Sequence, residues 1–336
     1  MKAYEIQQFG VENLALVERG EPQINDTEVL VKFHAASLNY RDLAMVKGSY
    51  NPRLKTPLVP FSDGAGEVVA VGGQVSKWKT GDRVSPIFMQ GWIDGPISYE
   101  KARTALGGDR DGTLREFGAF DESGLVRIPD HFSYEEAATL PCAAVTAYHA
   151  LFESGNLHPS DSVLLQGTGG VSIFALQLAS VYGSRTILTS SSDEKLERAK
   201  NLGADDLINY KEREDWDKAV QDLTDRRGVD HVVEVGGAGT FQKSLNSVKM
   251  GGHIAVIGAL SGGQGGVSPV SILMKLVRLQ GIFVGSRQMF EQMNLLLCQH
   301  YHIKPVIGKI FEFGEVRDAL KYMEAGAHFG KIVIKF

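Results

Sequence analysis

Residues 162–205 constrain what this chain can fold into more than any other stretch. An apolar run over 163–165 suits a buried strand, a glycine-rich turn follows at 167–170, and an amphipathic pattern then continues to Gly183. A second apolar run occupies 186–189. Strand, glycine turn, helix and strand in this order predict a βαβ unit, which indicates an α/β fold.

The glycine turn predicts a binding site for the pyrophosphate of a dinucleotide. Such a group lies against backbone N–H groups at a helix N-terminus only where no Cβ blocks its approach. Gly167 allows the tight turn, and Gly169 or Gly170 allows the approach. Ser172 replaces the third glycine of G-x-G-x-x-G and is small enough for helix and strand to pack closely. Glycine turns also join strands and helices that bind no ligand. The prediction of a dinucleotide site therefore depends on the strand before the turn and on the helix and second strand that follow it.

The rest of the chain predicts a second, β-rich domain. Two domains are natural for 336 residues. Up to about residue 125, short apolar runs such as 28–33 and 66–71 alternate with turns, which indicates an irregular barrel. Beyond residue 160, strand and helix patterns alternate, which is typical of a parallel sheet. A helix around 316–323 and a strand over 331–336 end the chain.

Two segments between these regions are less regular. A helical pattern covers 134–154, with Ser133 and Glu136 placed for a capping box and Pro141 at a point where the helix would split. Residues 89–112 combine apolar side chains with glycines that break any period. A functional loop and a surface excursion are both open there.

Composition and charge exclude several classes of protein. The 35 Lys and Arg residues against 40 Asp and Glu give a net charge of -5, which offers no electrostatic case for nucleic acid or an anionic membrane. Cys142 and Cys298 are the only cysteines, which argues against a disulfide framework. The first ten residues contain no apolar leader segment. We therefore predict a cytoplasmic protein that acts on a small molecule.

The order of a β-rich domain before a dinucleotide fold resembles the medium-chain dehydrogenase/reductase superfamily. The resemblance implies an α/β fold with a GroES-like β-rich catalytic domain, 1–152 and 288–336, and a Rossmann doubly wound parallel-sheet domain, 153–287. A homodimer is the assembly that it implies. The motifs that carry it are PLVP at 57–60, DGAGEV at 63–68, VG at 71–72, GDRV at 81–84, LPCAAVTAY at 140–148, GTGGV at 167–171 and HFGKIV at 328–333.

The zinc ligands of that superfamily are missing from this sequence. Zinc-dependent members use a cysteine, a histidine with a nearby glutamate, and a second cysteine. Here Asn39, Ser62 and Asp63 stand at the first three positions, and only Cys142 remains. Asn and Ser side chains are poor zinc ligands. The four-cysteine structural lobe is also absent, because no cysteine precedes Cys142. We predict a zinc-free protein in which Cys142 is a small buried residue.

The end of the second strand predicts NADP(H) as the preferred cofactor over NAD(H). NAD-specific sites place Asp or Glu there, on the ribose hydroxyls, whereas this chain has Ser190 and Ser191. By resemblance, Lys195 would bind the 2′-phosphate and Tyr210 would pack beside it. Two alternatives stay open. The serines could simply cap the next helix, or a shift of register could bring the acidic pair 193–194 into the pocket.

The resemblance also assigns the remaining cofactor contacts. The glycine turn would bind through Gly167, Thr168, Gly169, Gly170 and Val171. Thr146 would contact the nicotinamide ring, and Lys331 would reach the pyrophosphate. Gly258, Phe283 and Val284 would surround the nicotinamide through backbone contacts.

Without zinc, another group must stabilise the oxyanion that hydride transfer creates. Tyr50 falls on the catalytic tyrosine of mitochondrial-type enoyl-thioester reductases, so the resemblance implies a hydrogen-bond donor or proton source. Asn39 or Tyr40 would be the second polar contact. The alternative is that Tyr50 only forms a pocket wall.

These features together predict a zinc-independent, NADPH-dependent oxidoreductase that reduces a carbonyl-conjugated C=C in an enone, quinone or enoyl thioester. A zinc-free alcohol dehydrogenase or ketone reductase is the alternative within the enzymes. A non-enzymatic NADPH-binding protein is the alternative of another class.

Overall fold

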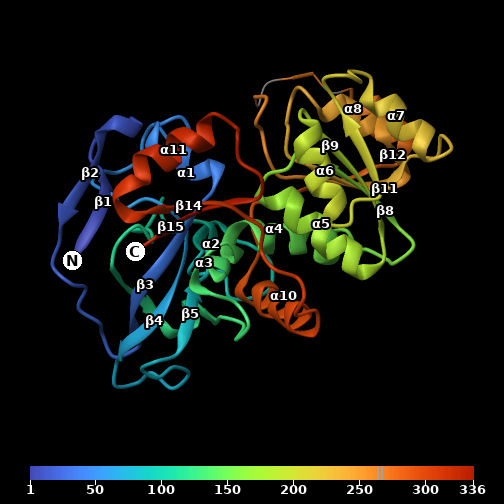
Figure 1. The fold of residues 1–336 in the computed structure, drawn as a ribbon. Helices are drawn as coiled ribbons and strands as arrows, with labels where there is room; N and C mark the ends of the chain where they lie inside the picture. Colours follow the sequence, from blue (N-terminus) through green and yellow to red (C-terminus); the bar gives the residue numbers. More distant parts are fainter. Residues whose placement is uncertain (263–264, 267) are drawn as a thin grey trace. The chain divides into compact units, whose positions relative to one another are not determined.

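The computed structural model describes residues 1–262, 265–266 and 268–336, and the chain forms two compact units (Figure 1). Unit 1 consists of Met1–Val145 and Val284–Phe336, and unit 2 of Thr146–Phe283. The domain boundaries expected from the sequence, 152/153 and 287/288, stay a prediction.

Unit 1 is built on two β-sheets. A small sheet pairs β1 with β2, and a larger one has the order β14-β15-β3-β4-β5-β7, with β6 also paired to β3. Neighbours in the larger sheet are antiparallel except β14 and β15. The strands are β1 (Lys2–Ile6), β2 (Leu14–Glu18), β3 (Glu28–Leu38), β4 (Asp63–Val71), β5 (Arg83–Pro86), β6 (Phe117–Asp121), β7 (Leu125–Arg127), β14 (Ile307–Glu312) and β15 (Lys331–Lys335).

The helices of unit 1 are short, apart from one near each end of its second segment. They are α1 (Tyr40–Val46), α2 (Tyr99–Ala102), α3 (Tyr134–Ala137), α10 (Arg287–Gln299) and α11 (Val316–Glu324), with 3₁₀ turns at Val11–Asn13, Glu122–Gly124 and Phe313–Glu315. Helix α11 buries Val316, Ala319, Leu320 and Met323, whose spacing gives one apolar face. This face packs into a core with Leu38 and strand β15, so the end of the chain is part of the first domain's core.

Unit 2 contains a parallel sheet of the order β10-β9-β8-β11-β12-β13. Its strands are β8 (Ser162–Gln166), β9 (Arg185–Ser190), β10 (Asp206–Asn209), β11 (Val229–Glu234), β12 (Val248–Val256) and β13 (Arg278–Gly281). Its helices are α5 (Gly170–Tyr182), α6 (Asp193–Asn201), α7 (Trp216–Leu223), α8 (Phe241–Ser247) and α9 (Pro269–Lys275), while α4 (Val145–Tyr148) begins at the boundary of the units.

The central strands of unit 2, β8 and β11, are buried along their whole length because helices cover both faces of the sheet. Leu164 of β8 and Ile187 of β9 belong to a core that also takes in residues of α7 and α8. Helices α5 and α6 contact β8, β9 and β10, and Figure 1 shows them beside these strands. A sheet buried in this way explains the continuous apolar runs in the sequence.

The predicted α/β architecture is confirmed, but the helix over 134–154 is not continuous. The capping box forms: Ser133 N donates to Glu136 Oε2 (2.8 Å), and Glu136 N donates to Ser133 Oγ (3.1 Å). After α3, however, the chain passes through π-helical turns at Leu140–Ala144 and His149–Ser154, on either side of α4. Pro141 lacks the N–H that a regular helix needs, which accounts for the first break. Within the described residues, no helix has the length and apolar character to cross a membrane.

Candidate active site

The glycine turn of unit 2 forms an open cradle at the start of α5. Gly167 has φ +72°, and a Cβ built at Gly167 or at Gly169 would meet no atom within 4 Å. Ser172 Oγ donates to the carbonyl of Gln166 (2.6 Å), which ties the first turn of the helix to the end of β8. Open backbone at the N-terminus of a long helix fits a phosphate group. Thr168, Gly170 and Val171 belong to the same turn.

The end of β9 is a cluster of serines, as the sequence indicates. Ser190 is the last residue of the strand, and its carbonyl accepts from the backbone N–H of Tyr210 (3.0 Å), so these two predicted residues are neighbours. Ser191 follows in the turn, and Ser192 caps α6 by accepting from Lys195 N (3.4 Å). Both burial and nearby Arg198 lower the pKa of Lys195.

The first acidic residue after this turn, Asp193, has a partner outside it. Asp193 is the first residue of α6, and its Oδ1 accepts from Asn209 Nδ2 (2.7 Å). Since β9 ends at Ser190, neither Asp193 nor Glu194 stands at the strand's last position. The register that the serine interpretation requires is therefore the one that forms.

A buried carboxylate that the sequence analysis did not single out organises the loop after β11. Glu234 is the last residue of this strand and is fully buried. Its Oε1 accepts from the backbone N–H groups of Gly236 (2.8 Å) and Gly237 (2.9 Å), and further donors are Thr240 Oγ1, Gln166 Nε2 and Ser244 Oγ. Gln166 directly precedes the glycine turn, so Glu234 connects that turn with the β11–α8 loop. The sequence indicated this role of Glu234 only by an acidic residue at the end of an apolar strand that precedes two glycines.

The residues expected around a nicotinamide lie in different environments. Thr146 is buried, and its Oγ1 has no hydrogen-bond partner among the described residues. Gly258 follows β12, and a Cβ there would lie 2.4 Å from the carbonyl oxygen of Val235. The side chain of Phe283 is half-exposed, whereas Val284 is buried in an apolar cluster of unit 1 with Phe88.

Asn39 of unit 1 lies in a buried polar network. Asn39 Nδ2 donates to Ser62 Oγ (3.3 Å), and Ser62 Oγ donates to Asp63 Oδ1 (2.7 Å). Asp63 Oδ2 accepts from the backbone N–H of Cys142 (3.1 Å). Burial raises the pKa of Asp63, and the nearby Lys331 opposes this effect. The four positions at which zinc-dependent relatives carry ligands are thus joined by hydrogen bonds.

Lys331 completes this network. Its side chain is 3% exposed. Its Nζ donates to Leu38 O and to Asn39 Oδ1, both at 2.6 Å, and lies 3.9 Å from Asp63 Oδ2. All of these acceptors belong to unit 1. The contact of Lys331 with a pyrophosphate that the resemblance implies stays a prediction.

Tyr50 and Tyr40 are the exposed members of the predicted catalytic set. Tyr50 is 46% exposed, and the Arg41 guanidinium lies 5.8 Å from its ring centroid. Burial raises the pKa of Tyr50, an effect that Arg41 opposes and Cys142 reinforces. The phenol is therefore protonated at neutral pH. Tyr40, the first residue of α1, is 54% exposed, so its hydroxyl is free to meet solvent or a ligand.

Asp42 holds the backbone of Asn39. Its Oδ2 accepts from the N–H of Asn39 (2.8 Å), and its Oδ1 lies 3.5 Å from Arg41 Nη1. Burial raises the pKa of Asp42 to about 7 despite Arg41. Both flanks of Asn39, its main chain and its amide, are therefore fixed.

These residues do not fit a zinc ion. Across the described residues, no cluster of three or more His, Cys, Asp or Glu side chains is placed to hold a metal. Asn39 Oδ1 faces the Lys331 ammonium, and burial raises the pKa of the Cys142 thiol, which disfavours the thiolate that zinc requires.

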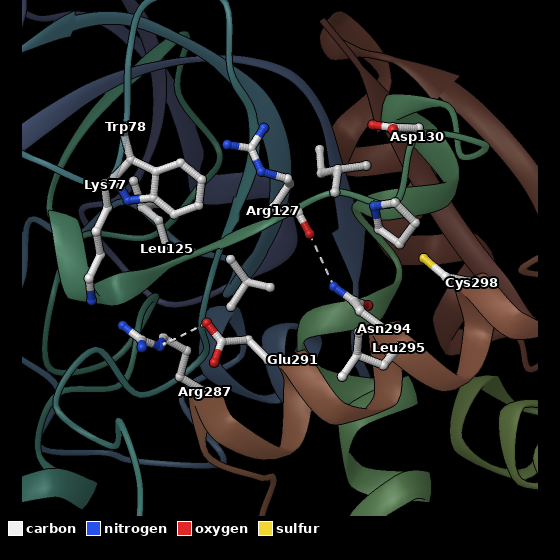
Figure 2. Close-up of a pocket in the computed structure, with 13 residues that line it drawn as sticks. Lys77, Trp78, Leu125, Arg127, Asp130, Arg287, Glu291, Asn294, Leu295 and Cys298 are labelled. Atoms are coloured by element: carbon white, nitrogen blue, oxygen red, sulfur yellow. Dashed lines mark hydrogen bonds and ion pairs between the residues drawn. The ribbon is translucent and has the colours of Figure 1, made fainter.

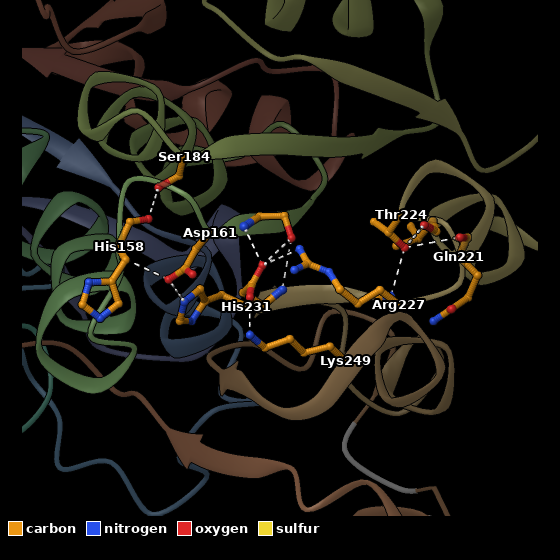
Figure 3. A network of polar contacts seen from close by, with 12 residues as sticks. His158, Asp161, Ser184, Gln221, Thr224, Arg227, His231 and Lys249 are labelled. Carbon is orange, nitrogen blue, oxygen red and sulfur yellow. Dashed lines mark hydrogen bonds and ion pairs between the residues drawn. The ribbon is translucent and has the colours of Figure 1, made fainter.

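A second polar network of unit 2 (Figure 3) lies at the amino ends of the parallel strands, whereas the glycine turn follows the carboxyl end of β8. His231 Nε2 lies 3.0 Å from Asp161 Oδ2, at the amino ends of β11 and β8. Asp230 accepts from Ser162 N (2.8 Å) and from Lys249. Although burial opposes it, these hydrogen bonds lower the pKa of Asp230 to about 2. Ligands of open α/β sheets bind at the carboxyl ends of strands, so this network stabilises the fold.

A surface groove of about 510 Å³ in unit 1 contains none of the predicted site residues (Figure 2). It lies between Lys77–Trp78, the segment 125–130 and helix α10. Arg127 lies over the Trp78 ring (5.4 Å) and pairs with Asp82, and Arg287 pairs with Glu291. The Arg127 and Arg287 side chains of the groove are thus already paired with carboxylates, and we assign the groove no part in the reaction.

Comparisons with known proteins agree with this architecture. The family model described as alcohol dehydrogenase GroES-like domain matches residues 25–130, and the one described as zinc-binding dehydrogenase matches residues 170–298. A zinc-type alcohol dehydrogenase-like protein of Schizosaccharomyces pombe is 43% identical over 97% of this chain and 96% of its own length. A 2-methylene-furan-3-one reductase of Solanum lycopersicum is 33% identical over 99% of this chain and 79% of its own length.

Solved structures give the same result. The crystal structure of an NAD-dependent alcohol dehydrogenase matches with a TM-score of 0.91 and 31% identity, covering 100% of both chains. The predicted fold, a GroES-like domain with a Rossmann-type parallel sheet, is confirmed. The chain therefore belongs to the medium-chain dehydrogenase/reductase superfamily of NAD(P)-dependent oxidoreductases.

Proposed function

We propose that this protein is a zinc-independent, NADPH-dependent reductase of carbonyl-conjugated C=C bonds. The observation that carries the proposal is the neutral Asn39 amide, which stands in a buried hydrogen-bonded network at the first of the positions where the resemblance places zinc ligands. The Tyr50 phenol of the same unit is the second proposed donor. The tomato relative is named as a reductase of 2-methylene-furan-3-one, an enone. The similar alcohol dehydrogenases favour carbonyl reduction as the second candidate.

The residues proposed to bind the cofactor belong to unit 2, except Val284 of unit 1. The open cradle at Gly167, Thr168, Gly169, Gly170 and Val171 would hold the pyrophosphate, and Thr146 and Gly258 the nicotinamide end, with Phe283 and Val284. Ser190, Ser191, Lys195 and Tyr210 would surround the 2′-phosphate. The preference for NADPH is supported by the serine at the end of β9 and by the engagement of Asp193 with Asn209.

The bound nicotinamide supplies the hydride, and the chain's own residues manage the oxygen and the proton. Hydride addition to a conjugated C=C places negative charge on the carbonyl oxygen as an enolate. An amide N–H of Asn39 and the Tyr50 hydroxyl would donate hydrogen bonds to that oxygen. The Tyr50 hydroxyl would transfer its proton to that oxygen, and the enol so formed would tautomerise to the saturated ketone by proton exchange with solvent. The Tyr50 phenolate would recover a proton from solvent, and Tyr40 would be a further polar contact.

Cofactor binding is tested first, by titrating the protein with NADPH and NADH and following nicotinamide fluorescence. We expect tighter binding of NADPH and a loss of this preference in Lys195→Ala. Gly169→Ala should weaken both cofactors without disturbing the fold, because its Cβ meets no protein atom and its φ is -78°. Gly20→Ala, at a glycine that is equally open, is the matched control. Equal or tighter binding of NADH would contradict the NADPH assignment.

The reaction itself is tested by product analysis with a simple enone and NADPH. A saturated ketone is expected, formed more slowly by Tyr50→Phe and Asn39→Asp. An allylic alcohol would reject C=C reduction and establish the ketone reductase. Zinc independence is tested in the same assay with a chelator and with metal analysis of the protein. Loss of activity on chelation, restored by Zn²⁺, would contradict it.

The exposed edge of unit 2 supports the proposal of a homodimer. Strand β13 ends the sheet with every residue exposed, and helix α9 carries Val270, Leu273 and Met274 at 60–68% exposure. An open strand edge beside apolar side chains favours pairing with a second copy. Leu273→Asp should shift the mass measured by light scattering from dimer to monomer, whereas Leu295→Asp, at a similarly exposed leucine of α10, should not. A monomeric wild-type protein would refute the proposal. The cytoplasmic location stays a prediction.

A further inference from the structure

The Arg41 guanidinium is held beside the Tyr50 ring by three segments of unit 1. Its Nη1 donates to the carbonyl of Leu106 (2.9 Å) and lies 3.5 Å from Asp42 Oδ1. Its Cζ lies 4.7 Å from the centroid of the Phe88 ring and 5.8 Å from that of the Tyr50 ring. The Arg41 side chain is only 11% exposed, so these contacts fix the position of its charge.

The end of the irregular segment 89–112 takes part in this arrangement. Leu106 supplies the carbonyl that accepts from Arg41. A Cβ at Gly108 would lie 2.5 Å from Arg41 Nη2, so the guanidinium packs directly against this glycine. Of the two interpretations left open for this segment, a functional loop and a surface excursion, these contacts favour the functional loop.

Tyr50 is tied through its main chain to the helix that carries Arg41. The backbone N–H of Tyr50 donates to the carbonyl of Ala44 in α1 (3.2 Å), and the N–H of Ser49 donates to the same oxygen (3.0 Å). Gly48, with φ +74°, makes the turn between the helix and Tyr50. The helix and this turn therefore place the phenol and the guanidinium next to each other.

The charge of Arg41 is only partly compensated by its neighbours. A guanidinium stays protonated in proteins and can only donate hydrogen bonds. The Nε atom of Arg41 is buried and has no acceptor among the described residues. Burial raises the pKa of its carboxylate neighbour, Asp42, to about 7, so near neutral pH this neighbour is ionised in only part of the molecules. A positive charge therefore remains effective at Tyr50.

The groups around Tyr50 give its hydroxyl a direction. Burial raises the pKa of the phenol, and Cys142 and Asp109 act in the same direction, whereas Arg41 lowers it through its charge and a side-chain hydrogen bond. Because a guanidinium has no lone pair, the phenol oxygen is the acceptor of that hydrogen bond. The hydroxyl hydrogen therefore points away from Arg41. Since Tyr50 is 46% exposed, this hydrogen can be donated to a ligand.

We propose that Arg41 is a positioning residue that directs the Tyr50 hydroxyl toward the substrate and stabilises the phenolate left when Tyr50 has given up its proton. The inference rests on the proposed function for the identity of the substrate. In this step the O–H bond of Tyr50 breaks, an O–H bond forms on the enolate oxygen, and the negative charge passes to the phenol oxygen. Arg41 keeps its own protons, and its hydrogen bond to that oxygen becomes stronger because the acceptor is charged. Solvent then returns a proton to Tyr50.

Four variants separate this role from a purely structural one. Arg41→Met removes the charge and keeps an apolar stem beside Phe88. Arg41→Gln is a second neutral variant, and its amide can still donate a hydrogen bond. Arg41→Lys keeps a positive charge but not the planar fork of donors. Arg83→Met is the matched control, because the Arg83 guanidinium also lies 4.7 Å from an aromatic ring, that of Tyr134, and donates to a backbone carbonyl.

Kinetics with NADPH and an enone are the first readout. We expect kcat to fall about 10- to 100-fold in Arg41→Met and Arg41→Gln, the effect of losing a hydrogen bond to a charged group. Arg41→Lys should recover part of this loss, and Arg83→Met should keep the wild-type kcat. In a Tyr50→Phe background, Arg41→Met should lower kcat by less than about twofold, because a residue that acts through Tyr50 then has no phenol to act on. An unchanged kcat in both neutral variants, or equal fold-losses with and without Tyr50, would overturn the proposal.

The second readout works even if the protein reduces no enone. In ¹³C NMR spectra of protein labelled at the tyrosine Cζ, the signal that disappears in Tyr50→Phe belongs to Tyr50, and its pH dependence gives the ionisation midpoint of this phenol. We expect the midpoint to rise in Arg41→Met and Arg41→Gln, to return toward the wild-type value in Arg41→Lys, and to stay unchanged in Arg83→Met. An unchanged midpoint in the neutral variants would refute the inference whatever the reaction. The expected rise without reduction of an enone would reject the proposed substrate and leave the role of Arg41 intact.

Discussion

Lowering the pH should destabilise unit 2 chiefly through the buried His253, with a contribution of the same sign from His231, whose pKa burial also lowers. His253 of β12 is 1% exposed, lies opposite His231 and Arg278 in the sheet register, and has Ser154 Oγ 2.9 Å from its Nε2. Burial, with His231 and Arg278 nearby, lowers the pKa of His253 from 6.5 to about 4. Protonation of folded His253 therefore places a positive charge in a buried site next to the Arg278 guanidinium and the His231 imidazole.

The magnitude follows from the difference in proton uptake. Unfolded His253 binds a proton below its ordinary pKa of 6.5, whereas the folded residue does so only near 4. The stabilisation is therefore fully present above pH 6.5 and is lost as the pH falls toward 4. Between pH 7.5 and pH 5 the loss is roughly 2 kcal/mol, equivalent to a fall in Tm of roughly 4–8 °C for a domain of this size.

The assay compares the wild type with His253→Gln, which keeps a polar group near Ser154 and removes the titration. Hydrogen exchange of β11 and β12 amides at the two pH values reports the opening free energy of unit 2 alone. This local readout matters because Asp42 in unit 1 has a raised pKa, about 7, and acts with the opposite sign. We expect acidification to lower the opening free energy of unit 2 in the wild type and, to the same extent, in His302→Gln, a variant at an exposed histidine. Most of this loss should be absent in His253→Gln. Equal acid losses in the wild type and His253→Gln would refute the reasoning.

The remaining predictions concern single side chains. Glu234→Ala removes the acceptor of the Gly237 N–H and leaves the Gly236 N–H only Gln166 Oε1 at 3.3 Å, so it should cost roughly 1–3 kcal/mol in urea denaturation. Glu234→Gln, whose oxygen can still accept from both, should cost less, and the reverse order would contradict the role of the carboxylate. Gly258→Ala places a Cβ 2.4 Å from a backbone oxygen and should lower the free energy of unfolding by roughly 1–3 kcal/mol. It should also weaken NADPH binding in a fluorescence titration, and unchanged binding would remove Gly258 from the cofactor site. Ser133→Ala removes the cap of α3 and should cost about 1 kcal/mol in the same denaturation experiment with kcat unchanged; a large loss of kcat would mean that this cap does more than hold a helix end.

Local patterns in the sequence were sufficient for much of the fold. The βαβ unit around the glycine turn forms as predicted, because apolar periodicity and turn residues act over a few neighbouring positions. The Ser133 capping box forms for the same reason. The helical pattern over 134–154 is interrupted at Pro141, where the sequence placed a split. The π-helical form of the turns on either side of α4 was not predicted.

Part of the candidate site was also accessible from sequence. Two features could be recognised from residue identity at motif positions alone. They are the absence of zinc ligands at Asn39 and Ser62 and the presence of a serine at the end of β9. Glu234 gave a weak signal at the end of its strand. Four of its five donors lie within ten residues of it along the chain. The fifth, Gln166, reaches it only because β8 and β11 pair, so the complete network could not be predicted from the local sequence.

The sequence by itself determined the superfamily, the two-part architecture and the residue types at the glycine turn and the former metal positions, because these depend on identity and spacing along the chain. Only the tertiary structure decided what Lys331 does. It lies almost three hundred residues from Asn39, and their 2.6 Å hydrogen bond exists because β15 pairs with the end of β3. Once buried there, an ammonium must use the nearest acceptors, and that requirement sets the direction of the Asn39 amide.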